Sequence, residues 1–340
     1  MASKVYFFGD VSRLRDGADA CFRIVAGDFG AGKVGFKVHF GEGVNETHVK
    51  SEWLRGVTDF FEEPVFVECN VLYRGFRTRR EDHVKTAVEH GFGFIPIDIL
   101  DGELGEESME VPISGGEISV AKLGAGLSKY DKLVSIAHFK GHMATGFGGT
   151  LKNIGMGLGA RPGKLEMHAI MSPRVTEEKC ISCGTCAADC PVDAITLNPK
   201  ARIDPEVCIG CVHCIAVCPE KAIDIPWETA DSVNTNLMHR IADYARAAVK
   251  DRICWFMNFV TDVTYDCDCF NIKQTPFMKD VGILLSKDPV AVDAASLDLV
   301  KEKNQGADPF MEKHGVDGTE ILKYAEKHGL GKREYEIKNF

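Results

Sequence analysis

The chain has 340 residues, which suggests about two domains, and 45% of its residues are hydrophobic, enough to bury a core. No run approaches the ~18 apolar residues of a membrane helix. The formal net charge of −10 argues against nucleic acid as the main partner, because phosphate binding needs a basic face. The absence of a targeting segment at the N-terminus predicts a cytoplasmic protein.

In chain order, apolar runs predict strands at residues 5–8, 34–40, 65–69, 95–99 and 133–137, with a helix at 81–90. Residues 109–113 and 117–123 are expected to form a hairpin across the turn at 114–116. Residues 141–163 hold eight glycines, which permit close approach of the backbone to a ligand or another element. A helix near residues 237–248, strands at 253–259 and 281–285, and a last helix at 318–327 follow a cysteine-rich segment. Asp288 and Pro289 predict the start of another helix, which ends near Lys303.

These α/β elements lie on both sides of the cysteine-rich segment. The simplest interpretation is one discontinuous α/β domain, residues 1–172 plus 227–340, with a small domain inserted at residues 173–226. Eight of the thirteen cysteines lie in that segment, in two copies of C-x2-C-x2-C-x3-C-P that start 28 residues apart. The copies are Cys180, Cys183, Cys186, Cys190 and Cys208, Cys211, Cys214, Cys218. Such tight groups are typical of metal ligation in a reducing compartment rather than of disulfides.

The repeat predicts two interleaved [4Fe–4S] clusters. Three closely spaced cysteines can bind one cubane, while the fourth, followed by proline, reaches the other. Cluster one is therefore expected at Cys180, Cys183, Cys186 and Cys218, and cluster two at Cys208, Cys211, Cys214 and Cys190. Backbone N–H groups around Gly184 and Gly210 are expected to donate to sulfur. Zinc is the alternative, but the full run, twice, with both prolines is far more specific for clusters. Over about 50 residues the segment resembles the two-[4Fe–4S] bacterial ferredoxins, which implies a small α+β domain that moves single electrons.

The α/β part resembles the iron–sulfur protein family known as DUF362. The resemblance rests on segments KVHFG at 37–41, NVLYRG at 70–75, HFKGH at 138–142, GGTLKN at 148–153, DCDC at 266–269 and DPVAVD at 288–293. It implies an α/β host with a ferredoxin insert but no secure reaction. His142, the glycine pair at 148–149 and Lys152 also loosely resemble the nickel-pincer lactate racemases, as a hint of shared ancestry.

A second site is expected where His138, Lys140, His142 and Lys152 follow a predicted strand, because ligands bind at strand ends of α/β sheets. These residues predict a catalytic site for an anionic substrate or cofactor, or a metal held by imidazole; the alternative is ordinary polar residues at a strand end.

Cys267 and Cys269 allow three interpretations: a third metal site completed by His138, His142 or Cys254, a redox-active dithiol, or bystander thiols in an acidic loop. In an extended segment both thiols point to one face and Asp266 and Asp268 to the other. Cys21, Cys69 and Cys254 read as buried apolar residues.

Three further features need an interpretation. Asp293 reads either as a ligand or as a carboxylate near a helix N-terminus. The G-x4-G-K pattern at residues 27–33 is rejected as a phosphate loop, because Val34 replaces the Ser or Thr and a strand follows. The basic cluster Arg74, Arg77, Arg79 and Arg80 either binds an anion or forms a solvated face, the latter being favoured.

The first functional hypothesis is an electron-transfer oxidoreductase, whose insert relays electrons to the site near His142, Lys152, Cys267 and Cys269. The alternatives are a ferredoxin-like carrier whose host domain docks a redox partner, and a metal or cluster delivery protein. An acidic carrier is expected to dock a flavoprotein or ferredoxin-type partner through that partner's basic patch. A small-molecule substrate is also compatible with the sequence, whereas nucleic acid and membrane are not expected.

Overall fold

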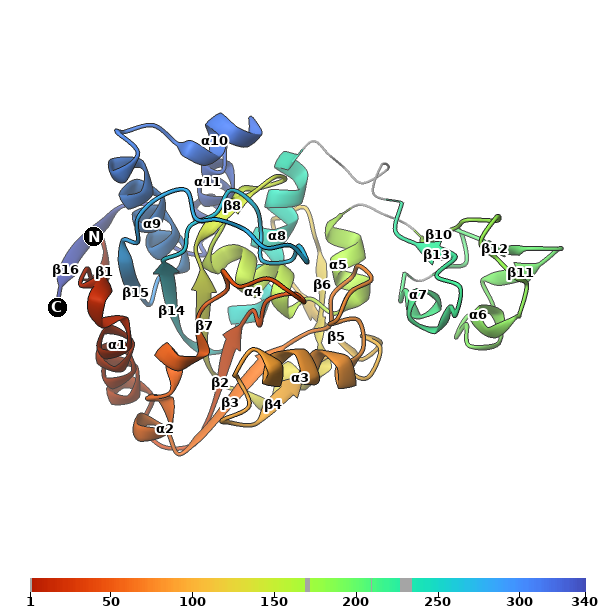
Figure 1. Cartoon of the computed structure of the whole chain (residues 1–340), viewed down its shortest axis with the longest axis horizontal. Coiled ribbons are helices and arrows are strands. Elements are labelled where there is room, and N and C mark those ends of the chain that lie inside the picture. The colour runs from red at the N-terminus through yellow and green to blue at the C-terminus, as the bar shows by residue number, and fades with distance from the viewer. Residues whose placement is uncertain (1, 169–171, 209, 227–233) are drawn as a thin grey trace.

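The computed structural model describes residues 2–168, 172–208, 210–226 and 234–340. Its centre is an eight-stranded sheet in the order β16-β1-β15-β14-β7-β2-β3-β4 (Figure 1). In that order the strands are Tyr335–Asn339, Ser3–Phe8, Gly282–Ser286, Ile253–Val260, Lys132–His138, Lys33–Val38, Glu63–Glu68 and Ile97–Ile99. Strands β14, β7, β2, β3 and β4 are parallel, whereas β15 runs antiparallel to both neighbours. The fold is therefore mixed α/β with a large, mainly parallel sheet.

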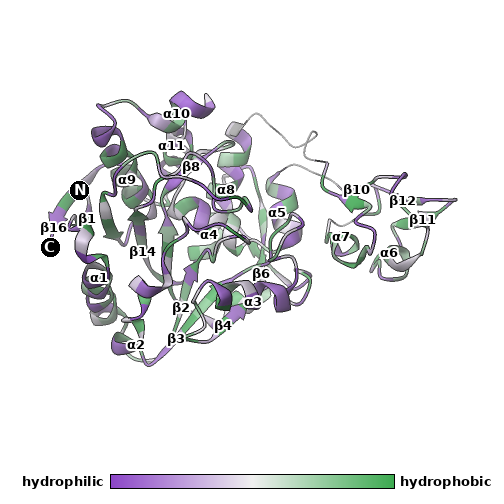
Figure 2. Ribbon diagram, in the orientation of Figure 1, coloured by the Kyte–Doolittle hydropathy of each residue, from purple (hydrophilic) through white to green (hydrophobic). Residues whose placement is uncertain are grey.

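Helices cover both faces of this sheet. Along β3, Val65 and Val67 belong to one hydrophobic core and Phe66 to the other, as the two-residue period of a strand requires. One face packs α1 (Leu14–Phe29), α2 (Val57–Phe60) and α3 (Arg80–Glu89); the other packs α4 (Thr150–Leu158), α8 (Asn234–Val249), α9 (Pro289–Lys303) and α11 (Thr319–Lys327). Figure 2 shows hydrophobic residues concentrated on strands such as β2 and β3. Among the described helices, none combines the length and apolar character needed to cross a bilayer.

The predicted strands and helices of the α/β part are confirmed, although the hairpin differs in its bounds and several other elements were not predicted. The hairpin pairs β5 (Ser108–Pro112) with β6 (Val120–Gly124), so its loop is longer than the predicted turn. Helix α1 was not predicted, although its buried residues recur at helical spacing. The edge strand β16 was also missed, because its side chains are half-buried or exposed and give no clear alternation.

The glycine-rich segment contains more regular structure than predicted. It forms β8 (Lys140–His142), β9 (Gly146–Gly148), α4 and the start of α5 (Arg161–Met167). Close approach is nevertheless why glycine stands there. A Cβ at Gly155 of α4 would lie 2.2 Å from the Ile241 carbonyl oxygen of α8, so this helix pair needs glycine at the contact.

Helix α9 begins at Pro289 and Asp288 is its N-cap, as predicted. Asp288 Oδ1 accepts the N–H groups of Val290 (2.9 Å) and Ala291 (3.0 Å). Asp288→Ala is expected to lower the free energy of unfolding by about 1–2 kcal/mol, measured by urea denaturation, because two helix donors lose their acceptor. Asp288→Asn keeps an acceptor and is the matched control. Equal stability of the alanine variant and the parent chain would contradict this role of the cap.

Residues 172–226 form a small unit of their own, at one end of the molecule beside α5 (Figure 1). Strand β10 (Arg174–Val175) pairs with β13 (Ile223–Asp224), and β11 (Ile195–Leu197) pairs with β12 (Ala201–Ile203). Two short helices, α6 (Thr185–Ala188) and α7 (His213–Val217), complete it, and the remaining host helix is α10 (Pro309–His314). The unit's hydrophobic cluster also includes Leu72 and Leu165 of the host. The predicted boundaries at 172 and 227 adjoin the stretches outside the described residues.

Candidate functional site

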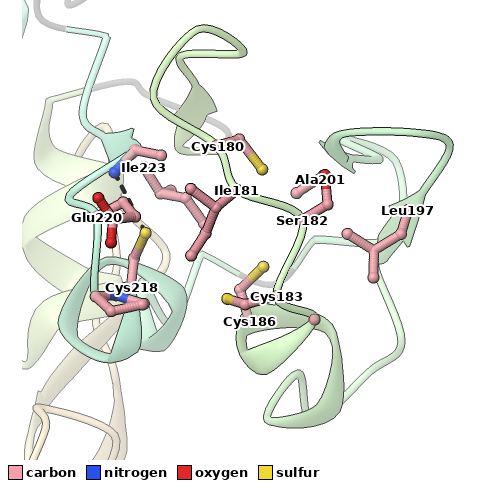
Figure 3. A pocket seen from close by; sticks show the side chains of 13 residues that line it. Cys180, Ile181, Ser182, Cys183, Cys186, Leu197, Ala201, Cys218, Glu220 and Ile223 are labelled. Atoms are coloured by element: carbon pink, nitrogen blue, oxygen red, sulfur yellow. Dashed lines mark hydrogen bonds between the residues drawn. The ribbon is translucent and has the colours of Figure 1, made fainter.

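Four cysteines line one pocket of the small unit. Cys180 and Cys183 come from the loop that enters α6, Cys186 lies in α6, and Cys218 follows α7 in the second repeat (Figure 3). These are the residues that the sequence assigns to the first cluster. Each of the four is a free thiol.

The other four cysteines are also neighbours. Burial raises the pKa of Cys208 and of Cys211, and nearby Cys190 raises both further. Burial raises the pKa of Cys214 to about 12, with contributions from Cys211, Cys208 and Cys190. These residues therefore lie close enough to repel one another as thiolates.

The two repeats present matching backbone donors to sulfur. Ala194 N–H donates to Cys190 Sγ and Ala222 N–H to Cys218 Sγ, both at 3.2 Å. The Gly210 N–H acts on Cys208 in the same sense, lowering a pKa that burial raises. Two groups of four thiols with amide donors to sulfur fit the needs of two [4Fe–4S] clusters in ligand type, ligand number and hydrogen bonding.

The prediction that Arg74, Arg77, Arg79 and Arg80 form a solvated face is wrong for the first three. Arg74 donates to the carbonyl oxygens of Ile215 (2.8 Å) and Ile223 (3.2 Å), and Arg79 donates to that of Ala216 (2.8 Å). Ile215 and Ala216 lie in the last turn of α7, where helix carbonyls lack intrahelical partners and attract cations.

Arg77 is buried and its Nε pairs with Glu42 Oε2 at 2.9 Å; Arg80 is the member that stays exposed. Nη2 of Arg77 also contacts His39 Nε2 (2.9 Å) and donates to Tyr73 Oη (2.7 Å). No role was predicted for His39, Glu42 or Tyr73. His39 and Tyr73 lie in the segments 37–41 and 70–75 that carry the family resemblance, and Glu42 directly follows the first of these segments.

A second group of candidate ligands lies at the carboxyl edge of the parallel strands. Ligand atoms of His142, Cys267 and Cys269 all lie within 4.8 Å of one another. The segment with the two cysteines is not extended: Phe270 N–H donates to the Cys267 carbonyl oxygen (3.1 Å), which closes a turn. The turn brings both thiols to one side, and Cys269 N–H lies 3.4 Å from Cys267 Sγ.

His138 contacts this turn through Asp268, the residue between the two cysteines. Its Nδ1 lies 2.8 Å from Asp268 Oδ2 and its Nε2 lies 2.8 Å from the Thr261 carbonyl oxygen. Because both ring nitrogens face acceptors, His138 is a positioning residue here rather than a third ligand. Lys140 Nζ is 3.2 Å from Asp268 Oδ2. Burial pushes the pKa of Asp268 up, but His138 and Lys140 outweigh it and hold that pKa well below its usual value.

Lys152 lies beside the thiols, with Nζ 3.8 Å from Cys267 Sγ. A hydrogen bond from Cys269 lowers the pKa of Cys267 well below its ordinary value, and Lys152 and Lys140 act in the same direction against burial. The same hydrogen bond raises the pKa of Cys269. Burial, with the charge of Lys152, lowers the pKa of His142 well below its ordinary value. The site thus combines a neutral imidazole with a thiolate–thiol pair.

The other predicted residues lie elsewhere. Cys254 lies at the start of β14, whereas the loop with Cys267 follows the end of that strand. Cys254 therefore does not complete the site. Cys21 and Cys69 are buried, as predicted. Asp293 accepts the N–H groups of Thr150 (2.7 Å) and Leu151 (2.9 Å) and so caps α4. Strand β2 starts at Lys33, which supports the rejection of a phosphate loop.

A model of the family described as "Domain of unknown function (DUF362)" matches residues 34–298 of this chain. No curated protein matches it. Among solved structures, the lactate racemase apoprotein from Thermoanaerobacterium thermosaccharolyticum is 12% identical with a TM-score of 0.45, over 88% of this chain and 57% of that one. A protein from Thermotoga maritima is 12% identical with a TM-score of 0.42, over 86% and 58%. The chain thus spans less than two thirds of the length of either structure.

Proposed function

The chain belongs to the DUF362 family, and because that family's description leaves its function open, we propose one from the two sites. The protein is an iron–sulfur electron-transfer protein. Two [4Fe–4S] clusters in residues 173–226 pass single electrons to the group formed by His142, Lys152, Cys267 and Cys269. A substrate is oxidised or reduced at that group.

One observation carries the proposal. Cys218 shares a pocket with Cys180, Cys183 and Cys186, although it belongs to the other repeat. A zinc site built from C-x2-C pairs uses four ligands and does not require two complete, interleaved sets. When bound, the clusters supply reversible one-electron transfer. The chain's own contribution is the thiolates, the amide donors at Ala194 and Ala222, and the partial burial that sets the local polarity.

The segment 72–79 connects the two sites. Its Arg74 and Arg79 bind the end of α7, while Leu72 packs into the hydrophobic cluster of the small unit. Tyr73 and Arg77 of the same segment approach the dithiol: the charge of Arg77 lowers the raised pKa of Cys269. Electrons that leave the small unit would thus meet this segment before the dithiol.

The external redox partner is expected to be a flavoprotein or a ferredoxin-type protein with a basic docking surface. The formal net charge of −10 supports such a partner through long-range attraction. Free cysteines and oxygen-sensitive clusters favour the reducing cytoplasm as the compartment.

The test is an anaerobic reductive titration of the full chain after reconstitution with iron and sulfide. About two electrons per chain are expected, one for each cluster, together with an electron paramagnetic resonance signal from two coupled centres. Cys254→Ser is the matched control and is expected to behave as the parent chain. Colourless protein, or zinc alone at the eight thiols, would contradict the proposal.

A further inference from the structure

We propose that His142, Cys267 and Cys269 hold one mononuclear divalent ion of the zinc class, with an open fourth position that takes an anionic oxygen ligand such as a carboxylate. The inference rests on the proposed function and deepens it, because it assigns a metal ion to the group that would receive the electrons. Its geometry, however, is independent of the iron–sulfur clusters, so the two proposals can fail separately.

The three ligands are already close to tetrahedral spacing. Zinc lies about 2.3 Å from sulfur and about 2.0–2.1 Å from nitrogen, which places tetrahedral ligand atoms about 3.5–3.8 Å apart. The ligand atoms of His142, Cys267 and Cys269 all lie within 4.8 Å of one another. A contraction of about 1 Å, within reach of side-chain rotations, would therefore close the site around an ion.

The backbone under the three ligands is held in place. Gly141 N–H donates to the Thr264 carbonyl oxygen at 2.8 Å, which joins β8 to the cysteine loop. A Cβ at Gly141 would lie 2.1 Å from the Tyr265 carbonyl oxygen, so only glycine permits this contact. Strand β8 therefore presents the next residue, His142, directly to the loop that carries Cys267.

Asp268 fixes the turn between the two cysteines. Its carboxylate contacts His138, Lys140 and Thr47, the last through a hydrogen bond of 3.2 Å from Thr47 Oγ1. The side chain of Asp268 is fully buried, and these partners satisfy its carboxylate. Outer partners of this kind orient ligands and are part of a working metal site.

The ring of His142 has a partner for the nitrogen that does not bind the ion. Nδ1 lies 3.1 Å from Thr145 Oγ1, and Thr145 Oγ1 donates its own proton to the Phe147 carbonyl oxygen at 2.8 Å. Thr145 Oγ1 can therefore accept Nδ1–H, which leaves the lone pair of Nε2 for a metal. In the other tautomer Nδ1 accepts from Ala144 N–H at 3.2 Å.

Ligand count and charge define what the fourth position takes. In the described part of the chain, the group contains three ligands, and catalytic zinc sites use three protein ligands plus water or substrate. Two thiolates neutralise a divalent ion, so the positive charge of Lys152 beside them is then left for an added anion. Lys140 is already paired with Asp268, whereas Lys152 Nζ stands 3.8 Å from Cys267 Sγ and can reach an added anion.

The first test is zinc analysis of the full-length, cluster-loaded chain purified without air. We expect about one zinc per chain, with an X-ray absorption spectrum at the zinc edge that shows two sulfurs near 2.3 Å and two nitrogen or oxygen ligands near 2.0–2.1 Å. This edge is separate from that of iron, so the clusters do not interfere. His142→Ala and Cys267→Ser are expected to lower zinc content at least tenfold with iron content unchanged, while Cys254→Ser keeps its zinc.

Each other outcome overturns a defined claim. Full iron without zinc, or a reversible disulfide between Cys267 and Cys269 in place of an ion, overturns the metal site alone. Zinc surrounded by four sulfurs assigns it to the cysteines of the repeats and counts against both the metal site and the electron-transfer proposal.

The second test addresses the fourth position, with acetate as the probe. Acetate is expected to change the zinc-edge spectrum of the parent chain, and Lys152→Met is expected to raise the acetate concentration at half-effect about tenfold while zinc content stays the same. Lys85→Met removes an exposed lysine of α3 and is the matched control. An unchanged acetate response in Lys152→Met overturns the anionic ligand.

Discussion

Replacing Cys218 with serine is expected to lower the iron content from about eight to about four atoms per chain, because one cluster loses a thiolate and the other keeps all of its own. The small unit is also expected to lose order. Its hydrophobic cluster includes Cys180 and Cys186 in the core, with Cys190, Cys214 and Cys218 packed against it. Metal binding to such a unit is folding free energy, of order 10 kcal/mol for structural zinc, and clusters are expected to act likewise.

The measurement is iron and acid-labile sulfide per chain, together with electron paramagnetic resonance of the reduced protein. Cys190→Ser should remove the other cluster, and in either variant the coupling between two centres disappears. Cys254→Ser lies in the host strand β14 and serves as the matched control. Full iron content in Cys218→Ser would show that this residue is not a ligand and would exclude the interleaved arrangement.

Acidification is expected to destabilise the host domain steeply between about pH 6.5 and pH 4. Burial lowers the pKa of His39, His83 and His142 well below the ordinary value, and lowers that of His48 and His168 to about 4. Below pH 6.5 the unfolded chain therefore binds protons at these five rings that the folded chain does not bind. The free energy of unfolding decreases as the pH is lowered wherever the unfolded state binds more protons than the folded state.

Two buried carboxyl groups oppose this trend. Burial raises the pKa of Asp101 and of Asp293 to about 6, so the folded chain holds two protons that the unfolded chain releases above about pH 4. Five protons bound by the unfolded state less two held by the fold leave an excess of about three, which corresponds to about 4.1 kcal/mol per pH unit near pH 5.

Urea unfolding of the host, followed by far-ultraviolet circular dichroism at pH 7, 6 and 5, measures this slope. His48→Gln removes one of the five rings and is expected to reduce the slope by about 1.4 kcal/mol per pH unit. A stability that stays constant from pH 7 to pH 5 would mean that the histidines remain accessible to protons in the folded protein.

Local signals predicted most of the host correctly. Asp288 followed by Pro289 marks a helix start whatever surrounds it, because the cap and the fixed φ of proline act within one turn. The same applies to β7, whose apolar run is long enough to identify a buried strand. Helix α1 carries a comparable signal that was not predicted, because Ala18, Phe22 and Val25 are apolar residues at helical spacing.

The candidate site was only partly predictable, because its partners come from distant segments. His138, His142, Lys152 and the two cysteines were identified by residue type, but their separate roles depend on contacts. Two of these roles depend on Asp268. Its carboxylate pairs with His138, which is therefore not a ligand, and it lies in the turn that brings both cysteines to one side. Arg74 and Arg79 looked solvated because the carbonyl groups they bind lie about 140 residues away in sequence.

The position of β1 at the sheet affects the order in which the molecule is completed during synthesis. Its hydrogen-bonded neighbours are β15 and β16, so residues 3–8 have no strand to pair with until residues 282–339 have left the ribosome. The cysteine-bearing unit ends near residue 226, well before that point. If the proposed clusters form, their iron and sulfide can thus be delivered to a nascent chain in which β7 still lacks its neighbour β14.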